Sequence, residues 1–429
     1  MSIPLDRLYN YIENIAKEIN NSIVIYHFYP HGSKNIENLQ HLEGKVSWQY
    51  RTLNYSIYCH DQEPLNYELY QGVARDNSFT EILKSSFLKT DTNLMINSTM
   101  HDRACLVHSE KRSSELAKYQ RHPSPKCVDV YYWCHALVAL DWFRYAKHVV
   151  QQKQVSKTFL IYNRAWSGTR EYRLKFVELL IDSDLQNYCR TTVNPIEPEL
   201  GIHYSTHQFK NPGWRPNAVL EDYFPNNSAH SSYSADFDIK DYQNTDIEVV
   251  LETLFDDGRL HLTEKSLRPI ACAQPFIMAA THGSLEYLRS YGFRTFADVW
   301  DESYDLIEDP AKRLMKVVEL MKQIANWDSD TRERKIAQAR AVAEYNKQRF
   351  FSEDFFNQVI SELTSNLTTA LAQMTSDIDT SVFVDRWKKW ITHNEILNWL
   401  AANKNSEFPT LDQINNVLAI ANDVQKLKQ

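Results

Sequence analysis

The chain has 429 residues, of which 43% are hydrophobic and 24% are charged, and its formal net charge is −8 at pH 7. This length and composition are typical of a folded enzyme with two packed domains and exclude a disordered chain. The net charge argues against a strong, constitutive nucleic-acid binder, but it leaves open a contact with DNA through a local basic patch.

The N-terminal segment predicts an amphipathic helix and not an export signal. Leu5, Leu8, Ile12, Ile15 and Ile19 share one stripe, and acidic residues lie between them. No apolar run approaches the roughly 20 residues that are needed to cross a bilayer. The 6 cysteines are scattered without a Cys-x-x-Cys pair, which indicates reduced thiols and no structural zinc. We therefore expect a cytoplasmic protein that does not insert into a membrane.

Strand-like and helical runs alternate through the first part of the chain. The strand-like runs cover residues 22–30, 55–61, 92–98, 103–109 and 128–134, and the helical runs cover 113–120 and 135–152. Alternation of this kind predicts a parallel sheet with covering helices. The polar stretch 151–157 is predicted to be a linker to a second domain.

A second set of alternating runs follows this linker. It contains strand-like runs at 158–165, 246–255 and 275–280 and helical runs at 172–181 and 310–327. From about Glu344 onward the pattern is helical throughout, and such a tail is able to pack back across the first domain. We therefore predict three parts, which are an α/β domain at 1–152, a second α/β domain at 153–342 and a helical extension at 343–429.

A cluster of polar residues, within Cys59 to Leu65 (CHDQEPL), ends the apolar strand-like run at 55–61. In open parallel sheets, ligands bind beyond the carboxyl ends of the strands. A carboxylate or histidine at a strand end is held rigidly, as a general base for a hydroxyl proton must be. We favour Asp61 as this base, with Glu63 and His60 as alternatives. The other interpretation is that these side chains cap a helix or pair with an arginine.

A Thr-Glu-Lys triplet, Thr263 to Lys265, precedes a helical run that contains Pro269. Because proline lacks an N–H group and is tolerated near a helix start, the helix is predicted to begin close to Ser266. The free N–H groups and the charge of Lys265 attract a diphosphate, and Glu264 is able to accept hydrogen bonds from two adjacent ribose hydroxyls. The triplet therefore predicts a nucleotide-sugar site, and the alternative is an ordinary solvated helix start.

Asn163, Arg164 and Arg170 follow the first strand of the second domain. A guanidinium group binds phosphate oxygens with two parallel hydrogen bonds and keeps its charge, so Arg164 together with Lys265 would suit a diphosphate. The alternative is a salt bridge between the domains.

An Asp-x-Asp spacing at Asp236 and Asp238 is the remaining candidate for chemistry. Paired carboxylates with this spacing bind a divalent metal in some sugar-transferring enzymes. The surrounding residues are rich in turn formers, which favours a surface loop. We therefore expect no metal site and no required cofactor.

The Thr-Glu-Lys triplet, with the short helix and apolar strand that follow it, resembles the donor-binding segment of fucosyltransferase-like glycosyltransferases with two Rossmann-like domains (the GT-B type). The chain from about Tyr55 to Met321 also resembles uncharacterised glycosyltransferase-like proteins of large tailed phages. That second resemblance rests on four segments in a fixed order, which are CHDQEPL, HALVALDWFRYA (His135 to Ala146), IYNRAWSGTREYR (Ile161 to Arg173) and the triplet.

The resemblance implies a GT-B fold in which two parallel sheets face a cleft. It also implies that Arg164 binds the donor, with Arg170 as the alternative, and that Tyr233 lies on a donor-contacting loop. No counterpart of the fucosyltransferase base is found before residue 155. The assignment of Asp61 as the base therefore depends on its position at a strand end and not on the resemblance.

These observations predict a metal-independent glycosyltransferase that moves a hexosyl or pentosyl unit from a UDP- or GDP-sugar to an acceptor hydroxyl. The phage resemblance implies a hydroxymethylated pyrimidine in phage DNA as one acceptor. A surface glycan or a virion protein is a second possibility. A third is an inactive GT-B scaffold that serves binding or assembly.

Overall fold

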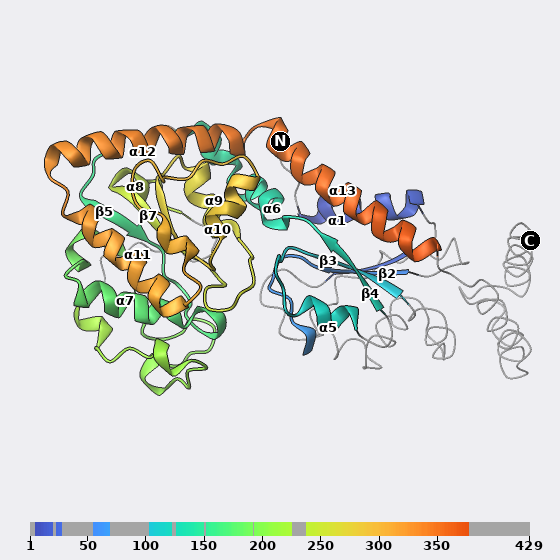
Figure 1. Cartoon of the computed structure of the whole chain (residues 1–429), viewed down its shortest axis with the longest axis horizontal. Helices are drawn as coiled ribbons and strands as arrows, with labels where there is room; N and C mark the ends of the chain where they lie inside the picture. The colour runs from blue at the N-terminus through green and yellow to red at the C-terminus, as the bar shows by residue number, and fades with distance from the viewer. Residues whose placement is uncertain are drawn as a thin grey trace, which may run out of the picture. The chain divides into compact units, whose positions relative to one another are not determined.

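The computed structural model describes residues 5–19, 23–27, 55–68, 103–121, 126–149, 152–191, 193–224 and 237–376. The strand predicted at 92–98, Tyr233 and the chain after residue 376 lie outside this part. The chain forms two compact units (Figure 1). Unit 1 comprises Met1–Leu5, Glu110–Ser113 and Trp133–Ile360, and unit 2 comprises Asp6–Ser109, Ser114–Tyr132 and Ser361–Gln429.

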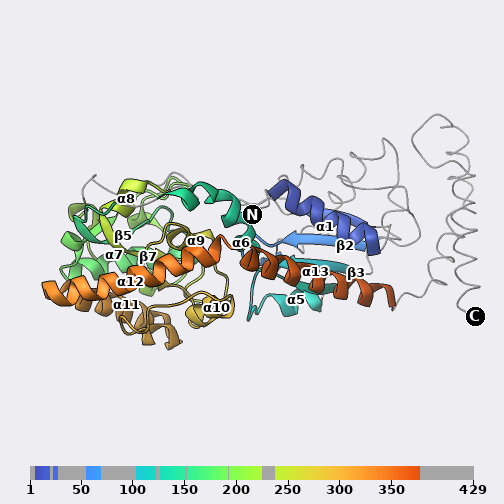
Figure 2. The same cartoon turned by 90° about the horizontal axis from the view of Figure 1, so that it is seen from above.

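Unit 2 is built on a parallel sheet whose strands follow one another in chain order. The strands are β1 (Ile23–His27), β2 (Tyr55–His60), β3 (Arg103–His108) and β4 (Lys126–Tyr131). Among the described residues of unit 2, the helices that accompany it are α1 (Leu5–Ile19), α5 (Leu116–Gln120) and the later part of α13 (Glu353–Ser376). Figure 2 shows α1 and α13 along the sheet, and their contact includes the hydroxyls of Tyr11 and Thr364, 2.9 Å apart. The predicted amphipathic helix is therefore confirmed, with Leu8 and Ile12 fully buried.

Unit 1 contains a second parallel sheet, in the order β6-β5-β7-β8. Its strands are β5 (Lys157–Ile161), β6 (Cys189–Thr191), β7 (Thr245–Leu251) and β8 (Phe276–Ala279). Every residue of β7 is buried, as expected for a central strand covered on both faces. The helices are α6 (Cys134–Trp142), α7 (Tyr172–Asp182), α8 (Ile239–Gln243), α9 (Glu264–Ala271), α10 (Ser284–Ser290), α11 (Pro310–Ala325) and α12 (Ser329–Phe350).

Both sheets are parallel and carry helices, so the predicted α/β fold is confirmed. Short 3₁₀ helices cover Arg144–His148, Gly168–Arg170, Gln186–Tyr188, Tyr204–Thr206, Pro212–Trp214, Leu220–Asp222 and Ser303–Leu306. Within the described ranges, no helix combines the length and the apolar character that a membrane span requires.

The units divide the chain at other places than the predicted boundaries of 152 and 342. The chain passes from unit 2 to unit 1 between Tyr132 and Trp133, so α6 belongs to unit 1. It passes back within α13, between Ile360 and Ser361. The side chain of Asn366 then donates to the carbonyl of Tyr131 over 2.7 Å, which ties α13 to β4 in the way predicted for the tail.

Hydrogen bonds of Lys153 anchor the described part of the predicted linker at 151–157 to unit 1. Lys153 Nζ donates to the carbonyls of Tyr242 (2.6 Å) and Thr245 (3.0 Å) and to Gln274 Oε1 (2.5 Å). Polar composition suggested a solvated connection. The three acceptors satisfy the ammonium group of the half-buried Lys153, so this lysine stabilises unit 1.

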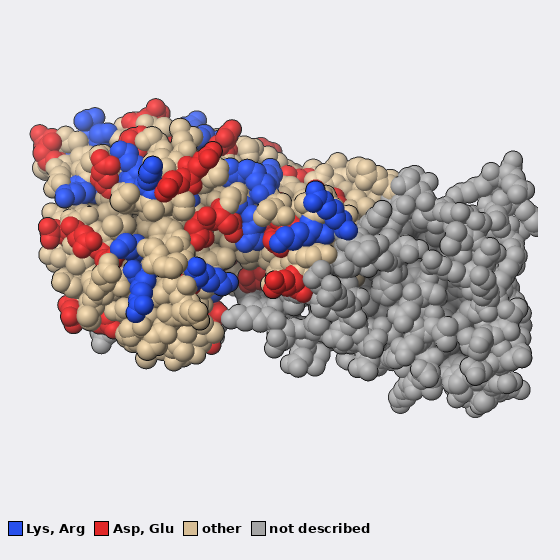
Figure 3. Space-filling model, turned by 60° about the horizontal axis from the view of Figure 1, so that its bottom comes forward, with Lys and Arg blue, Asp and Glu red and all other residues tan. Residues whose placement is uncertain are grey.

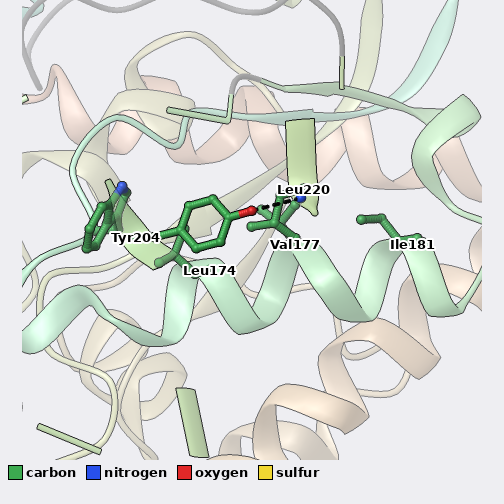
Figure 4. Packing of buried hydrophobic residues seen from close by; sticks show 6 residues of the cluster. Leu174, Val177, Ile181, Tyr204 and Leu220 are labelled. Atoms are coloured by element: carbon green, nitrogen blue, oxygen red, sulfur yellow. Dashed lines mark hydrogen bonds between the residues drawn. The ribbon is translucent and has the colours of Figure 1, made fainter. Parts of the chain in front are cut away.

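Residues 193–224, which follow β6, pack on one face of α7. Tyr204 and Leu220 of this segment contact Leu174, Val177 and Ile181 of that helix (Figure 4). The hydroxyl of Tyr204 accepts a hydrogen bond from the N–H of Leu220 over 3.1 Å. This hydrophobic cluster fixes the segment on unit 1.

Replacing Gly292 with alanine is expected to lower the free energy of unfolding by about 1–2 kcal/mol. Gly292 follows α10 with φ at +83°, and a Cβ there would lie 2.9 Å from Nε of Arg349. That guanidinium donates to the carbonyl of Tyr291 over 3.1 Å and would have to move. Urea unfolding measures the change. Gly258→Ala is the control, because a Cβ at Gly258 meets nothing within 4 Å, and equal midpoints for the two variants would contradict the prediction.

Candidate functional site

The carboxyl ends of β5, β7 and β8 lie at one edge of the unit 1 sheet, because these strands pair in parallel. Asn163 and Arg164 follow β5, Glu252 follows β7, and Thr281 follows β8. Ligands of open parallel sheets bind at this edge. The predicted donor residues of the second domain are thus delivered to the expected edge.

Helix α9 begins at Glu264, two residues before the predicted start at Ser266. Thr263 is the N-cap, and its hydroxyl accepts from the N–H of Lys265 over 3.4 Å. Pro269 lies inside the helix and not in its first turn, so the prediction that Pro269 marks the helix start is wrong. A proline is accommodated there because α9 ends within the next turn, at Ala271, and little of the hydrogen-bond ladder is lost.

Glu252 caps the same helix and was not identified from the sequence. Its carboxylate is fully buried and accepts from the N–H and hydroxyl of Thr263, at 3.0 and 2.7 Å, and from the N–H of Ser266 at 3.2 Å. The hydroxyl of Ser266 and the N–H of Thr253 donate to it as well. An internal carboxylate therefore already occupies part of the positive helix end, so anion binding there depends more on Lys265 than predicted.

Glu264 is a buried carboxylate that lies between Lys265 and His135. Its Oε1 lies 2.6 Å from Lys265 Nζ, and its Oε2 lies 3.2 Å from Nδ1 of His135 in α6. Burial raises the pKa of Glu264, but Lys265 and His135 outweigh burial and hold that pKa well below its ordinary value. The carboxylate is therefore ionised at neutral pH and is a strong acceptor for hydroxyl groups.

The residues after β5 differ in their surroundings. The side chain of Asn163 is 4% exposed, and its Oδ1 finds no hydrogen-bond donor among the described residues. Arg164 is half-buried, and its carbonyl accepts from Asn194 over 2.9 Å. Arg170 lies 3.7 Å from the carboxylate of Glu199, within unit 1. This salt bridge lies within one unit, so it is not the salt bridge between domains that was weighed as the alternative.

Two residues in the Ile161–Arg173 segment shape this edge without having been predicted to do so. The hydroxyl of Tyr172 donates to the carbonyl of Glu252 over 2.8 Å. Arg173 is buried and donates to the carbonyls of Ala165 and Leu251, both over 2.6 Å. The loop after β5 is thereby joined to the end of β7.

In unit 2 the structure places Asp61 directly after β2, in a group with two tyrosines. Its Oδ1 accepts from Tyr9 over 3.0 Å, and its Oδ2 accepts from Tyr132. Asp61 is 1% exposed, and Gln62 donates to Tyr9 over 2.5 Å. A base at this position would have to exchange a tyrosine hydroxyl for the hydroxyl that it deprotonates.

The two alternative bases lie beside Asp61 in the chain. His60 is buried, with Nδ1 3.3 Å from the hydroxyl of Tyr119, and Glu63 is half-buried. Tyr9 and Tyr132 could not be linked to Asp61 from the sequence, because they come from α1 and from the residue after β4.

The Asp-x-Asp spacing is placed only in part. Asp236 lies outside the described residues, and Asp238 caps α8 by accepting from the N–H of Lys240 over 2.9 Å. In the described part of the chain, no group of three or more His, Cys, Asp and Glu residues is arranged to hold a metal ion.

No family model and no curated protein matches the chain. Among solved structures, the chain is similar to a mutant of the T4 phage β-glucosyltransferase in complex with UDP-glucose. The similarity has a TM-score of 0.40 and 13% sequence identity, over 85% of this chain and 92% of that chain. No activity is assigned from a likeness at this level. The described residues themselves establish an α/β protein of two parallel sheets, with a polar cluster at the carboxyl edge of each.

Proposed function

We propose that the chain is a nucleotide-sugar-dependent glycosyltransferase of the GT-B type, with its donor site at the start of α9. The observation that carries the proposal is the ionised, buried carboxylate of Glu264 beside Lys265, at the carboxyl edge of a parallel sheet. A carboxylate in this position suits two adjacent ribose hydroxyls, and the ammonium group suits a diphosphate.

The residues after β5 extend this donor site. The buried Oδ1 of Asn163 meets no donor in the described part of the chain, which costs about 1–3 kcal/mol, and a ligand N–H or O–H would remove that cost. Arg164 is our candidate for the diphosphate, and Arg170 is the alternative. Tyr233 is proposed as a further donor contact.

The reaction would need a general base, and Asp61 is the first candidate, followed by Glu63 and His60. The acceptor oxygen would bond to the anomeric carbon as the bond to the diphosphate breaks, and the acceptor proton would pass to the base. Lys265 and Arg164 would stabilise the negative charge that develops on the departing diphosphate. Direct displacement of this kind inverts the anomeric configuration. No metal or further cofactor has a part in the proposal.

The acceptor that we propose is a hydroxymethylated pyrimidine in DNA, with a glycan or a virion protein as the rival. Figure 3 shows Lys and Arg side chains interspersed with Asp and Glu on one face of unit 1. Binding to DNA would therefore depend on local clusters and fall steeply with salt. Salt-dependent binding of hydroxymethylated DNA supports the first acceptor, and its absence supports the rival. Donor binding without any turnover would support an inactive scaffold.

Replacing Glu264 with alanine is expected to abolish nucleotide-sugar binding in a thermal-shift screen against UDP-glucose, GDP-mannose and the free nucleotides. A ligand at about 100 times its dissociation constant stabilises the native protein by about 2.7 kcal/mol, which the wild type would show as a higher Tm. Lys265→Ala is expected to lose the shift as well.

The control is Glu286→Ala, because Glu286 is exposed on the neighbouring helix α10. It should respond to the ligand as the wild type does. A wild type that no nucleotide or nucleotide-sugar stabilises would overturn the proposal and favour the scaffold.

A further inference from the structure

We infer that His135 is a positioning residue of the donor site, which holds the carboxylate of Glu264 in place to receive the ribose hydroxyls. This inference rests on the proposed function and adds a residue from a distant part of the chain. His135 lies in the first turn of α6, in the segment His135–Ala146 whose conspicuous apolar residues indicate only core packing.

The contact between His135 and Glu264 joins two buried side chains from different helices. Nδ1 of His135 lies 3.2 Å from Oε2 of Glu264, and the two side chains are 6% and 4% exposed. A second contact fixes the same region, because the indole N–H of Trp133 donates to the carbonyl of Leu262 over 2.9 Å. The starts of α6 and α9 are thus held together by a second contact, two residues before His135 and two residues before Glu264.

Glu264 needs such a partner because its other neighbour is a flexible lysine. Lys265 Nζ lies 2.6 Å from Oε1 of Glu264 and 3.4 Å from the hydroxyl of Thr263. Without His135 the carboxylate would be free to turn toward Lys265. Its hydroxyl-binding lone pairs and the charge offered to the diphosphate would then be lost together.

The charged groups around His135 favour its protonated form. Burial lowers the pKa of His135, but the close contact with the carboxylate of Glu264 and its negative charge outweigh burial, so the pKa lies above its ordinary value. Lys265 opposes this effect and Glu252 adds to it. The ring of His261 is also in contact, with its centroid 5.1 Å from that of His135.

The affinity for the donor should depend on pH because the pKa of His135 is raised. Below its raised pKa, His135 is charged and attracts the carboxylate of Glu264 at 3.2 Å, and above that pKa the ring is neutral and the attraction is weaker. Donor affinity of the wild type should therefore fall as pH rises through the raised pKa of His135. Nucleotide-sugars keep a constant charge across pH 5.5–8.5, so the protein causes the change.

The test measures the affinity of UDP-glucose and GDP-mannose for His135→Leu and His135→Asn by calorimetry across this pH range. Leucine fills the space but donates nothing, and it is expected to weaken binding about tenfold or more, the equivalent of one charged hydrogen bond. Asparagine retains an N–H donor near the position of Nδ1. It is expected to restore most of the affinity but to remove the pH dependence.

A cycle with Glu264→Gln shows whether His135 acts through Glu264. In that background, His135→Leu should cause no further loss, whereas additive losses would overturn the inference. His148→Leu is the matched control, because His148 is exposed in the 3₁₀ helix that follows α6.

The outcomes separate the inference from the proposed function. If the wild type binds a probe and His135→Leu binds it equally well with only a lower Tm, His135 is structural and the inference fails alone. If the wild type binds neither probe, the proposed function fails and the inference fails with it.

Discussion

Replacing Glu252 with alanine is expected to lower the free energy of unfolding of unit 1 by about 3–5 kcal/mol and to abolish donor binding. The carboxylate accepts from the backbone N–H groups of Thr253, Thr263 and Ser266 and from two hydroxyls. Each buried donor left without an acceptor costs about 1–3 kcal/mol, and some of them will find water. Because Thr263 and Ser266 flank Glu264, their release would also displace the donor site.

Urea unfolding and the thermal-shift response to nucleotide-sugars measure the two parts of this prediction. Glu252→Gln should lie between the wild type and the alanine variant, since an amide keeps one acceptor oxygen but points N–H groups at other donors. The control is Glu333→Ala, on the exposed side of α12. A Glu252→Ala protein as stable as the control would show that the carboxylate does not hold the start of α9.

Replacing Arg313 with methionine is expected to lower the free energy of unfolding of unit 1 by about 3–4 kcal/mol. Arg313 is 2% exposed, and it donates to the carbonyls of Ala280 (2.9 Å), Ile307 (2.6 Å) and Glu308 (3.0 Å) and to that of Phe255. Methionine has a similar volume, so most of the loss would come from carbonyl groups that no longer have a donor.

The Arg313→Lys variant shows whether the site requires the positive charge or the planar arrangement of donors. A lysine keeps the charge but cannot span four carbonyls from three separate segments, so it should recover only part of the loss. The change is read from the urea midpoint, with Lys312→Met of the same helix as the control. If lysine restores full stability, charge and not the planar donor array is what the site requires.

Much of the fold was predictable from the sequence because its periodic patterns are local. The apolar run of β7 and the stripe of α1 appear where expected, and alternating elements predicted two parallel sheets. The boundaries between the two units were harder to predict from the sequence. The run at 128–134 reads as one strand, yet the chain leaves unit 2 within it, after Tyr132.

The candidate site was predictable to the extent that it lies in one short segment. Thr263, Glu264 and Lys265 are neighbours in the chain, and they meet at the start of α9 as expected. Glu252 was not predicted to belong to the site, because the role of an acidic residue at a strand end depends on its hydrogen-bond donors, which the sequence does not show. His135 was missed because its partner, Glu264, comes from a helix far along the chain.

The sequence by itself determined the α/β class, the triplet at the mouth of a helix and the placement of Asp61 at a strand end. These depend on periodicity, turn chemistry and neighbouring residues. Packing between distant elements, and no local pattern, brings Asp61 to Tyr9 and Tyr132 and places Glu264 between Lys265 and His135. The physical reason is that burial and hydrogen bonding depend on elements that meet through packing, and no local pattern records which elements meet.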